Sequence, residues 1–258
     1  MSLPFHKKGR YTSYALSAQL PHPKLAPEVF ITIHRVLIRA FEILREEGQP
    51  LATMIEPAIT RNLAKAIENR LRQTHEIPGF ASPFFERVTR EHECDNFDGT
   101  LEEKYPDLFF SIRPDDSFRS RIQSDQWGVF VECKPVDKKH KIGAKDMYLS
   151  EGIHRFVRGD YAWAMQDAMM VAFTRDGFSI SQHLAPILSQ RDELHLSENI
   201  AAFDEEQCPV DERHEALHTS THRRPFVWSE GRGPACPITL YHSWHDCTHP
   251  GDPHFIED

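Results

Sequence analysis

The sequence predicts an α/β domain in which a sheet of four or more strands is flanked by helices. Two segments with the apolar spacing of helices come first. Three short segments rich in aromatic and β-branched residues follow them, and turn-forming residues bound these segments. The chain of 258 residues, 40% of them hydrophobic, suffices for one large domain or for one core with a trailing subdomain. We divide it into an N-terminal arm and helix at 1–50, a core at 51–188, and an acidic segment with C-terminal strands packed on the core at 189–258.

The first helix is expected at 26–47, after a lead-in that contains several prolines. Its apolar residues recur every three or four positions, at Val29, Ile33, Val36, Leu37, Ala40, Phe41 and Leu44. Gly48 marks its end. A second helix with an apolar stripe of its own begins near Leu51 or Pro57 and ends near Arg72.

Three strands are expected at 85–93, Leu108–Ile112 and 129–133. A proline and paired aspartates at 113–117 favour a turn, so the last two strands should form a hairpin or lie side by side. Helices should follow at 146–157 and 160–174, or one helix broken at Gly159, and then a strand and turn at 178–188. Closing strands at 225–228 and 237–244 should form a hairpin at an edge of the sheet.

Two carboxylates and one amine fall on the central strand pair. Asp107 directly precedes one strand, and Glu132 and Lys134 lie two residues apart on the next. Because side chains alternate between the faces of a strand, Glu132 and Lys134 point the same way, and Cys133 points into the packing. Two carboxylates that face one pocket can hold a hard divalent cation such as Mg²⁺. A lysine beside that ion can orient or deprotonate an attacking water while the ion stabilises charge on phosphate oxygens.

Pro106-Asp107, followed by Glu132-Cys133-Lys134 at the end of an apolar strand, resembles the PD-(D/E)xK signature of the restriction-endonuclease-like nucleases. The resemblance covers roughly residues 51–174 and rests on a short motif, for which a salt-bridged strand end on the surface is the alternative. It implies a restriction-endonuclease-like core with a mixed central sheet flanked by helices. It also implies hydrolysis of DNA phosphodiester bonds, with Mg²⁺ or Mn²⁺ bound by Asp107, Glu132 and the backbone carbonyl of Cys133. Lys134 would position the attacking water.

Glu56 stands at the start of the second helix, directly before Pro57. The helix dipole favours a carboxylate there, so N-terminal capping alone would explain it. The resemblance implies a larger role, because a glutamate on the first core helix of these nucleases often completes the metal shell. We therefore count Glu56 among the candidate catalytic and metal-binding residues.

Cations gather after the Glu-x-Lys strand, although the chain as a whole has a net charge of −9. Basic side chains bind phosphate oxygens through charge-assisted hydrogen bonds. The resemblance implies that the following helix faces the DNA backbone. The candidate nucleic-acid-binding residues are Lys138, Lys139, Lys141, Arg155 and Gln166, each with solvated surface as the alternative. The acidic body favours a protein partner that recruits or activates the enzyme, and a homodimer would suit cleavage of both strands.

Two histidine-rich segments suggest zinc instead. His214-Glu215-Ala216-Leu217-His218 matches the His-Glu-x-x-His pattern of zinc metalloproteases, in which a helix places both histidines on one face and the glutamate is the general base. Its polar surroundings and the failure of the longer metzincin pattern argue against a protease. Near the C-terminus, the possible zinc donors are His242, His245, Cys247, His249 and His254. Their spacing matches no common zinc site.

Several other classes lack support. Five cysteines without a CxxC pair argue against a disulfide framework. No apolar run reaches the roughly 18 residues of a membrane span, and no signal-peptide pattern is present. A Gly-rich phosphate loop and a Gly-x-Ser-x-Gly elbow are both missing. We therefore expect a cytoplasmic protein without a membrane partner.

The favoured function is a metal-dependent endonuclease acting on DNA, as in a bacterial anti-phage or restriction system. One alternative is a catalytically inactive nuclease fold that serves as a binding or assembly subunit. Another alternative keeps the chemistry and uses RNA as the substrate.

Overall fold

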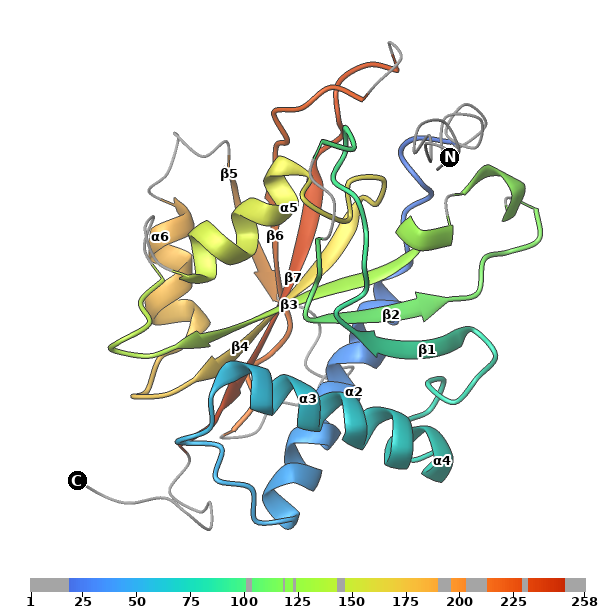
Figure 1. Cartoon of the computed structure of the whole chain (residues 1–258). Helices are drawn as coiled ribbons and strands as arrows, with labels where there is room; N and C mark the ends of the chain where they lie inside the picture. The colour runs from blue at the N-terminus through green and yellow to red at the C-terminus, as the bar shows by residue number, and fades with distance from the viewer. Residues whose placement is uncertain are drawn as a thin grey trace, which may run out of the picture.

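The computed structural model describes residues 19–100, 104–117, 119–122, 124–142, 147–189, 196–202, 213–228 and 232–248. In these ranges seven strands form one sheet, in the order β1-β2-β3-β4-β7-β6-β5 (Figure 1). The strands are β1 (Phe85–Arg90), β2 (Leu108–Ile112), β3 (Gly128–Val136), β4 (Asp167–Thr174), β5 (Leu196–Ala202), β6 (His218–His222) and β7 (Ile238–Asp246).

Both pairing modes occur in this sheet. The outer groups β1-β2-β3 and β7-β6-β5 pair antiparallel, whereas β3, β4 and β7 run parallel in the centre. Helices flank the sheet, so the predicted α/β class and mixed sheet are confirmed. None of the helices in the described ranges is long and apolar enough to cross a membrane.

Helix α2 (Pro27–Glu46) covers one face of the sheet, as the periodicity at 26–47 predicts. Its buried side meets β7, where the ring of Phe30 stacks on that of Tyr241 with centroids 3.8 Å apart. Gly48, with φ of +69°, follows the helix end in the left-handed region that glycine adopts without strain.

The second predicted helix is also confirmed. It begins as α3 (Glu56–Ala66), continues through a π-helical turn η1 (Ile67–Leu71) and ends with α4 (Arg72–Thr74). The carboxylate of Glu68 accepts a hydrogen bond from the backbone N–H of Val88 at 2.7 Å, which attaches this helical segment to β1.

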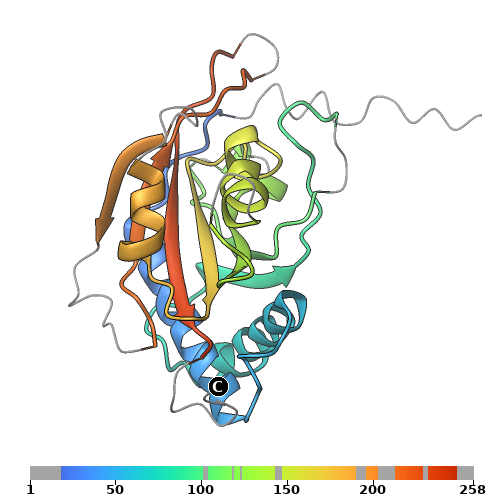
Figure 2. The same ribbon diagram turned by 90° about the vertical axis from the view of Figure 1, so that its left-hand side faces the viewer.

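The opposite face of the sheet is covered by η4 (Tyr148–Ile153) and α5 (His154–Arg158). The hydroxyl of Tyr148 hydrogen-bonds Nδ1 of His242 on β7 at 2.8 Å. His242 and Tyr241 are neighbours on that strand and therefore point to opposite faces. Helices α2 and η4–α5 thus enclose the sheet from its two sides (Figure 2).

The prediction of a helix at 160–174 is wrong, because this stretch contains strand β4. Every residue of β4 is buried, and it pairs in parallel with β3 on one side and β7 on the other. A strand buried on both faces is a continuous apolar run without the alternation that identifies a strand. The hydrophobic pattern of the sequence therefore could not distinguish strand β4 from a buried helix.

The strand predicted at 178–188 is also wrong. The structure has a helical segment there, formed by η5 (Ile180–Leu184) and α6 (Ala185–Ser189). The hydroxyl of Ser179 accepts a hydrogen bond from the backbone N–H of Gln182 at 3.3 Å and caps the segment. This local cap favours a helical start over an extended one.

The strand predicted at 237–244 is confirmed as β7, but the predicted hairpin with 225–228 at a sheet edge is not found. Strand β7 lies inside the sheet between β4 and β6, parallel to the first and antiparallel to the second. Residues 225–228 form no strand of the sheet, and Val227 makes only an isolated bridge with Pro234. The acidic segment before it, for which no strand was predicted, supplies β5 and β6.

Candidate active site

The site forms where β3 extends beyond the end of β2. Pairing between these two strands ends at Leu108 and Val131, so the next residues of β3 are free to bond other groups on that side. The backbone N–H of Cys133 there donates to Oδ2 of Asp107 at 2.7 Å. The unpaired backbone of β3 beyond Val131 thus holds the carboxylate of Asp107, which directly precedes β2.

The ammonium group of Lys134 is the centre of the site. Its Nζ lies 2.7 Å from Oε1 of Glu132, 3.3 Å from Oε1 of Glu56 and 3.6 Å from Oδ2 of Asp107. It also donates to the carbonyl oxygen of Cys133 at 2.9 Å. The Lys134 side chain is 4% exposed, so solvent screens these contacts weakly. The structure therefore brings together every residue predicted to be catalytic or metal-binding.

Two helical segments, α3 and η4, lie against this cluster. Glu56 is the first residue of α3, and the start of that helix brings its carboxylate to Lys134. On the other side η4 lies directly over the lysine stem. A Cβ atom added at Gly152 would lie 2.5 Å from Cε of Met170 and 3.6 Å from Cγ of Lys134. The absence of a side chain at Gly152 lets η4 pack closely against Met170 and the stem of Lys134.

Glu132 is held by two further side chains. Nη1 of Arg155 donates to its Oε1 at 3.0 Å, and the hydroxyl of Tyr161 donates to its Oε2. Arg155 was a predicted phosphate contact, and the structure shows it paired with Glu132. Tyr161 was missed as a site residue, since it falls within the helix predicted at 160–174. It lies in the link between α5 and β4, and no local pattern marks it.

Burial and charge together set the protonation of the cluster. Burial raises the pKa of Glu132 to about 7, and the nearby Asp107 carboxylate adds to that rise. Burial also raises the pKa of Glu56. For Lys134 burial alone would lower the pKa, but the three surrounding carboxylates outweigh it and raise that pKa above its ordinary value. Lys134 therefore stays an ammonium at neutral pH and acts as a hydrogen-bond donor there.

The donors around Lys134 are all oxygens, which is the chemistry of a site for Mg²⁺ or Mn²⁺. Within the described ranges no three His, Cys, Asp or Glu side chains are grouped so as to hold a metal ion as they stand, since these carboxylates face the ammonium. The side chains of Asp107 and Glu56 are 25% and 17% exposed, whereas that of Glu132 is 0% exposed. The donor atoms suit such an ion in their chemistry, although they are not grouped around one here, and an incoming ion would meet the more exposed Asp107 and Glu56 first.

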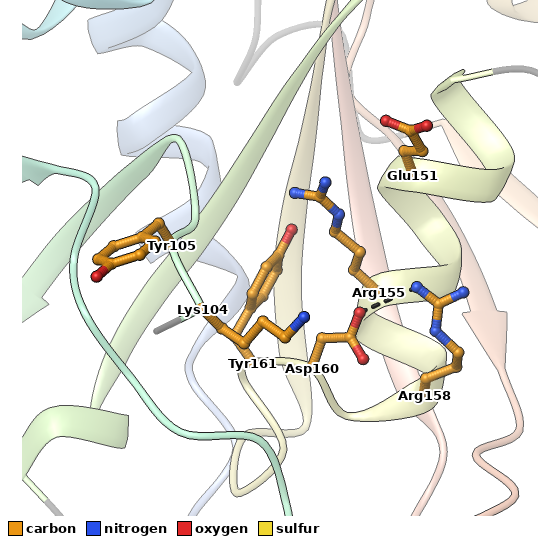
Figure 3. A pocket seen from close by; sticks show the side chains of 7 residues that line it. All are labelled: Lys104, Tyr105, Glu151, Arg155, Arg158, Asp160 and Tyr161. Atoms are coloured by element: carbon orange, nitrogen blue, oxygen red, sulfur yellow. Dashed lines mark hydrogen bonds and ion pairs between the residues drawn. The ribbon is translucent and has the colours of Figure 1, made fainter. Parts of the chain in front are cut away.

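A pocket of about 340 Å³ adjoins the cluster. Arg155 and Arg158 from α5 stand on one side of it, and Lys104 and Tyr105 from the segment before β2 stand on the other (Figure 3). Its remaining lining residues are Glu151, Asp160 and Tyr161. Because Arg155 and Tyr161 also contact Glu132, this pocket and the Lys134 cluster share a wall.

The other predicted nucleic-acid contacts lie away from Lys134. Lys138, Lys139 and Lys141 are exposed on the loop after β3, and Nζ of Lys138 is 4.0 Å from Oδ1 of Asp176. Gln166 precedes β4, where its amide donates to the carbonyl oxygen of His22 at 2.8 Å. It does not lie on the predicted helix, because that helix does not exist.

The zinc-protease alternative is wrong. His214 lies in an isolated bridge with His245, and His218 begins strand β6, so the two histidines of the motif share no helical face. On β7, His242 and His245 are three residues apart and point to opposite faces. Cys247 is buried just after β7. The remaining C-terminal donors, His249 and His254, lie outside the described residues.

The buried histidines near α2 form a hydrogen-bonded chain instead. Arg45 can only donate, so Nε2 of His214, 3.1 Å away, accepts. In neutral His214, Nδ1 then carries the hydrogen and donates to Nδ1 of His245 at 2.8 Å. Nε2 of His245 donates to the hydroxyl of Ser243 at 2.8 Å, and that hydroxyl donates to Nδ1 of His34 at 2.7 Å. One fixed cation thus sets the tautomer of each histidine.

Scans of the chain against protein-family models, curated proteins and solved structures found no match.

Proposed function

We propose that this chain is a metal-dependent nuclease of restriction-endonuclease-like type that hydrolyses phosphodiester bonds of DNA. The observation that carries the proposal is the contact of one buried ammonium, that of Lys134, with the carboxylates of Glu56, Asp107 and Glu132. The order of elements supports it, since α3 is followed by three antiparallel strands, a helix and a strand parallel to β3. The helix, three strands and helix follow the order that the resemblance implies for this nuclease core.

Asp107, Glu132, Glu56 and the carbonyl of Cys133 would hold Mg²⁺ or Mn²⁺. Such an ion, when bound, stabilises negative charge that develops on phosphate oxygens. With all three carboxylates ionised, Lys134 and Arg155 leave one negative charge on the cluster, which favours a cation there.

Lys134 would orient the attacking water by donating a hydrogen bond to it. The raised pKa of its ammonium leaves no lone pair at neutral pH, so it would not take the proton itself. Arg155 and Tyr161 would hold the Glu132 carboxylate in one orientation, because each binds a different oxygen of it. The Glu132 carboxylate would then already have its working orientation before the substrate binds.

A second candidate function is a nuclease fold without activity that serves as a binding or assembly subunit. It is favoured by the charge pairing in the cluster, where Lys134 already satisfies carboxylates that a metal would need. Calorimetric titration with Mn²⁺ separates the two functions. Binding that is lost in Asp107→Ala supports the nuclease, and no binding by the folded wild type supports the inactive subunit.

Cleavage of supercoiled plasmid and of single-stranded DNA tests the proposal. We expect cleavage with Mg²⁺ or Mn²⁺, none with EDTA, and none by Asp107→Ala with an unchanged circular-dichroism spectrum. Asp116→Ala is the matched control, because that carboxylate is 96% exposed on the loop after β2. Full activity of Asp107→Ala would overturn the assignment of the site.

A further inference from the structure

Arg175 connects the central strands of the sheet to the link between α2 and α3, and a role for it at the metal site rests on the proposed function. It directly follows β4, and its backbone N–H donates to the carbonyl oxygen of Val136 at 2.9 Å. Nη2 of its side chain donates to the carbonyl oxygens of Met54 at 2.7 Å and of Leu51 at 3.1 Å. The side chain is 14% exposed, so water competes weakly for these bonds.

The other end of the guanidinium is held at the end of β3. Nη1 of Arg175 donates to Oδ2 of Asp137 at 3.3 Å, and Asp137 comes three residues after Lys134. The other oxygen of that carboxylate accepts the backbone N–H groups of Lys139 at 2.9 Å and of His140 at 2.6 Å. The Asp137 carboxylate is therefore fixed by its own loop, and it fixes the guanidinium in turn.

The start of α3 has few other polar connections. Its N-cap residue, Ile55, is 70% exposed and supplies no side-chain cap. In the described part of the chain, no side chain from outside residues 50–55 other than Arg175 donates a hydrogen bond to that segment. Met54 precedes Glu56 by two residues, so the bond that fixes the Met54 carbonyl also fixes the first residue of the helix.

We propose that Arg175 is a positioning residue that holds Glu56 beside Lys134. Oε1 of Glu56 and Nζ of Lys134 are 3.3 Å apart, and this contact joins α3 to β3. Arg175 makes a second connection between the same parts of the fold. Its planar fork reaches a carboxylate on one side and two carbonyl oxygens on the other, which a lysine ammonium cannot do. Without it, Glu56 loses its fixed position and a metal ion at the site loses one carboxylate.

Metal affinity of the full chain gives the first readout. Calorimetric titration with Mn²⁺ compares the wild type with Arg175→Gln, each with and without Glu56→Gln. We expect Arg175→Gln to weaken binding about 10–100-fold, as the loss of a group that orients a metal ligand does. It should cause no further loss once Glu56 is replaced, because the two changes remove the same ligand. A role through charge alone would have the opposite sign, since removal of a cation favours binding of another.

Hydrogen–deuterium exchange of the metal-free protein gives the second readout. The backbone N–H groups of Met54, Ala58 and Ile59 are hydrogen-bonded around the start of α3. In Arg175→Gln these groups should exchange about tenfold faster. Arg72→Gln is the matched control and should leave them unchanged. Arg72 also donates to a backbone carbonyl and pairs with a carboxylate, but it does so at the far end of this helical segment.

Arg175→Lys is the second variant, and it keeps the charge and most of the buried stem. We expect it to weaken Mn²⁺ binding and to speed exchange in the same way, because one ammonium cannot bond both sides. It replaces Arg175→Gln if that variant does not fold.

The possible outcomes separate this inference from the proposed function. If the wild type binds Mn²⁺, unchanged affinity or unchanged exchange in the Arg175 variants overturns the role of Arg175 and leaves the nuclease standing. An equal loss of affinity with and without Glu56→Gln does the same. If the folded wild type binds no Mn²⁺, the nuclease is overturned and exchange alone decides. Faster exchange in the Arg175 variants then upholds Arg175 as the residue that holds Glu56, and unchanged exchange overturns that as well.

Discussion

Nζ of Lys134 lies 2.7 Å from Oε1 of Glu132, which is two residues earlier on the same strand. The same oxygen lies 3.0 Å from Nη1 of Arg155, and the other oxygen accepts the hydroxyl of Tyr161. Glu132 is fully buried, so it cannot turn without breaking contacts at both oxygens. It therefore sets the position of the Lys134 ammonium between Asp107 and Glu56.

Tyr161→Phe tests this positioning. The change removes one hydroxyl and keeps the ring, whose centroid lies 5.0 Å from that of Phe156. Loss of a side chain that orients a metal ligand typically costs about 10–100-fold in metal affinity or activity, and we expect a loss in that range. The measurement is the cleavage rate with Mg²⁺, beside metal affinity by calorimetry. Tyr241→Phe, on the α2 face of the sheet, is the control, and equal rates for the two variants would refute the role of Tyr161.

The stability of the protein should depend on pH through Glu215. Burial raises the pKa of Glu215 to about 7, although the backbone N–H of Ile180 donates to both its oxygens and opposes that rise. The folded pKa then exceeds the ordinary value of 4.5, so the folded state binds this proton more tightly. The resulting stabilisation is complete below the unfolded pKa and is lost as the pH rises through the folded pKa.

Urea unfolding of Glu215→Gln measures this contribution. The neutral side chain keeps an acceptor for Ile180 and removes the titration. Between about pH 5 and about pH 8 the wild type should lose about 2 kcal/mol of unfolding free energy relative to the variant. Glu86→Gln, at an exposed carboxylate on β1, is the control and should follow the wild type. A constant difference between Glu215→Gln and the wild type across this range would rule out the titration.

Ser243→Ala tests the histidine chain under α2. The hydroxyl of Ser243 bridges Nε2 of His245 and Nδ1 of His34, and all three residues are fully buried. Its removal leaves two buried ring nitrogens without that partner, each costing about 1–3 kcal/mol. We expect the free energy of unfolding to fall by about 2–4 kcal/mol in chemical denaturation. Ser189→Ala, at the exposed end of α6, should change it by less than about 0.5 kcal/mol, and equal losses in both variants would contradict the chain.

The catalytic candidates could be predicted because their arrangement is local. Strand alternation alone puts Glu132 and Lys134 on one face, and the pairing of β2 with β3 brings Asp107 beside them. Glu56 could not be predicted from local structure, since only the packing of α3 brings its carboxylate to Lys134. The resemblance to a nuclease signature supplied that residue.

The long-range features could not be predicted in the same way. Tyr161 reaches Glu132 from the link between α5 and β4, 29 residues further along the chain. Strand β4 lacks any alternation, because both of its faces are buried. The interior place of β7 depends on its parallel pairing with β4, whose residues lie far from it in the sequence.

Metal-dependent cleavage by the wild type beside Lys134→Ala tests the central claim most directly. The substrates are plasmid and single-stranded DNA with Mg²⁺ or Mn²⁺, and Lys65→Ala, an exposed lysine on α3, is the control. We predict cleavage by the wild type and Lys65→Ala, and none by a folded Lys134→Ala. Full cleavage by Lys134→Ala, or no cleavage and no metal binding by a folded wild type, would contradict the assignment of this site as a nuclease centre.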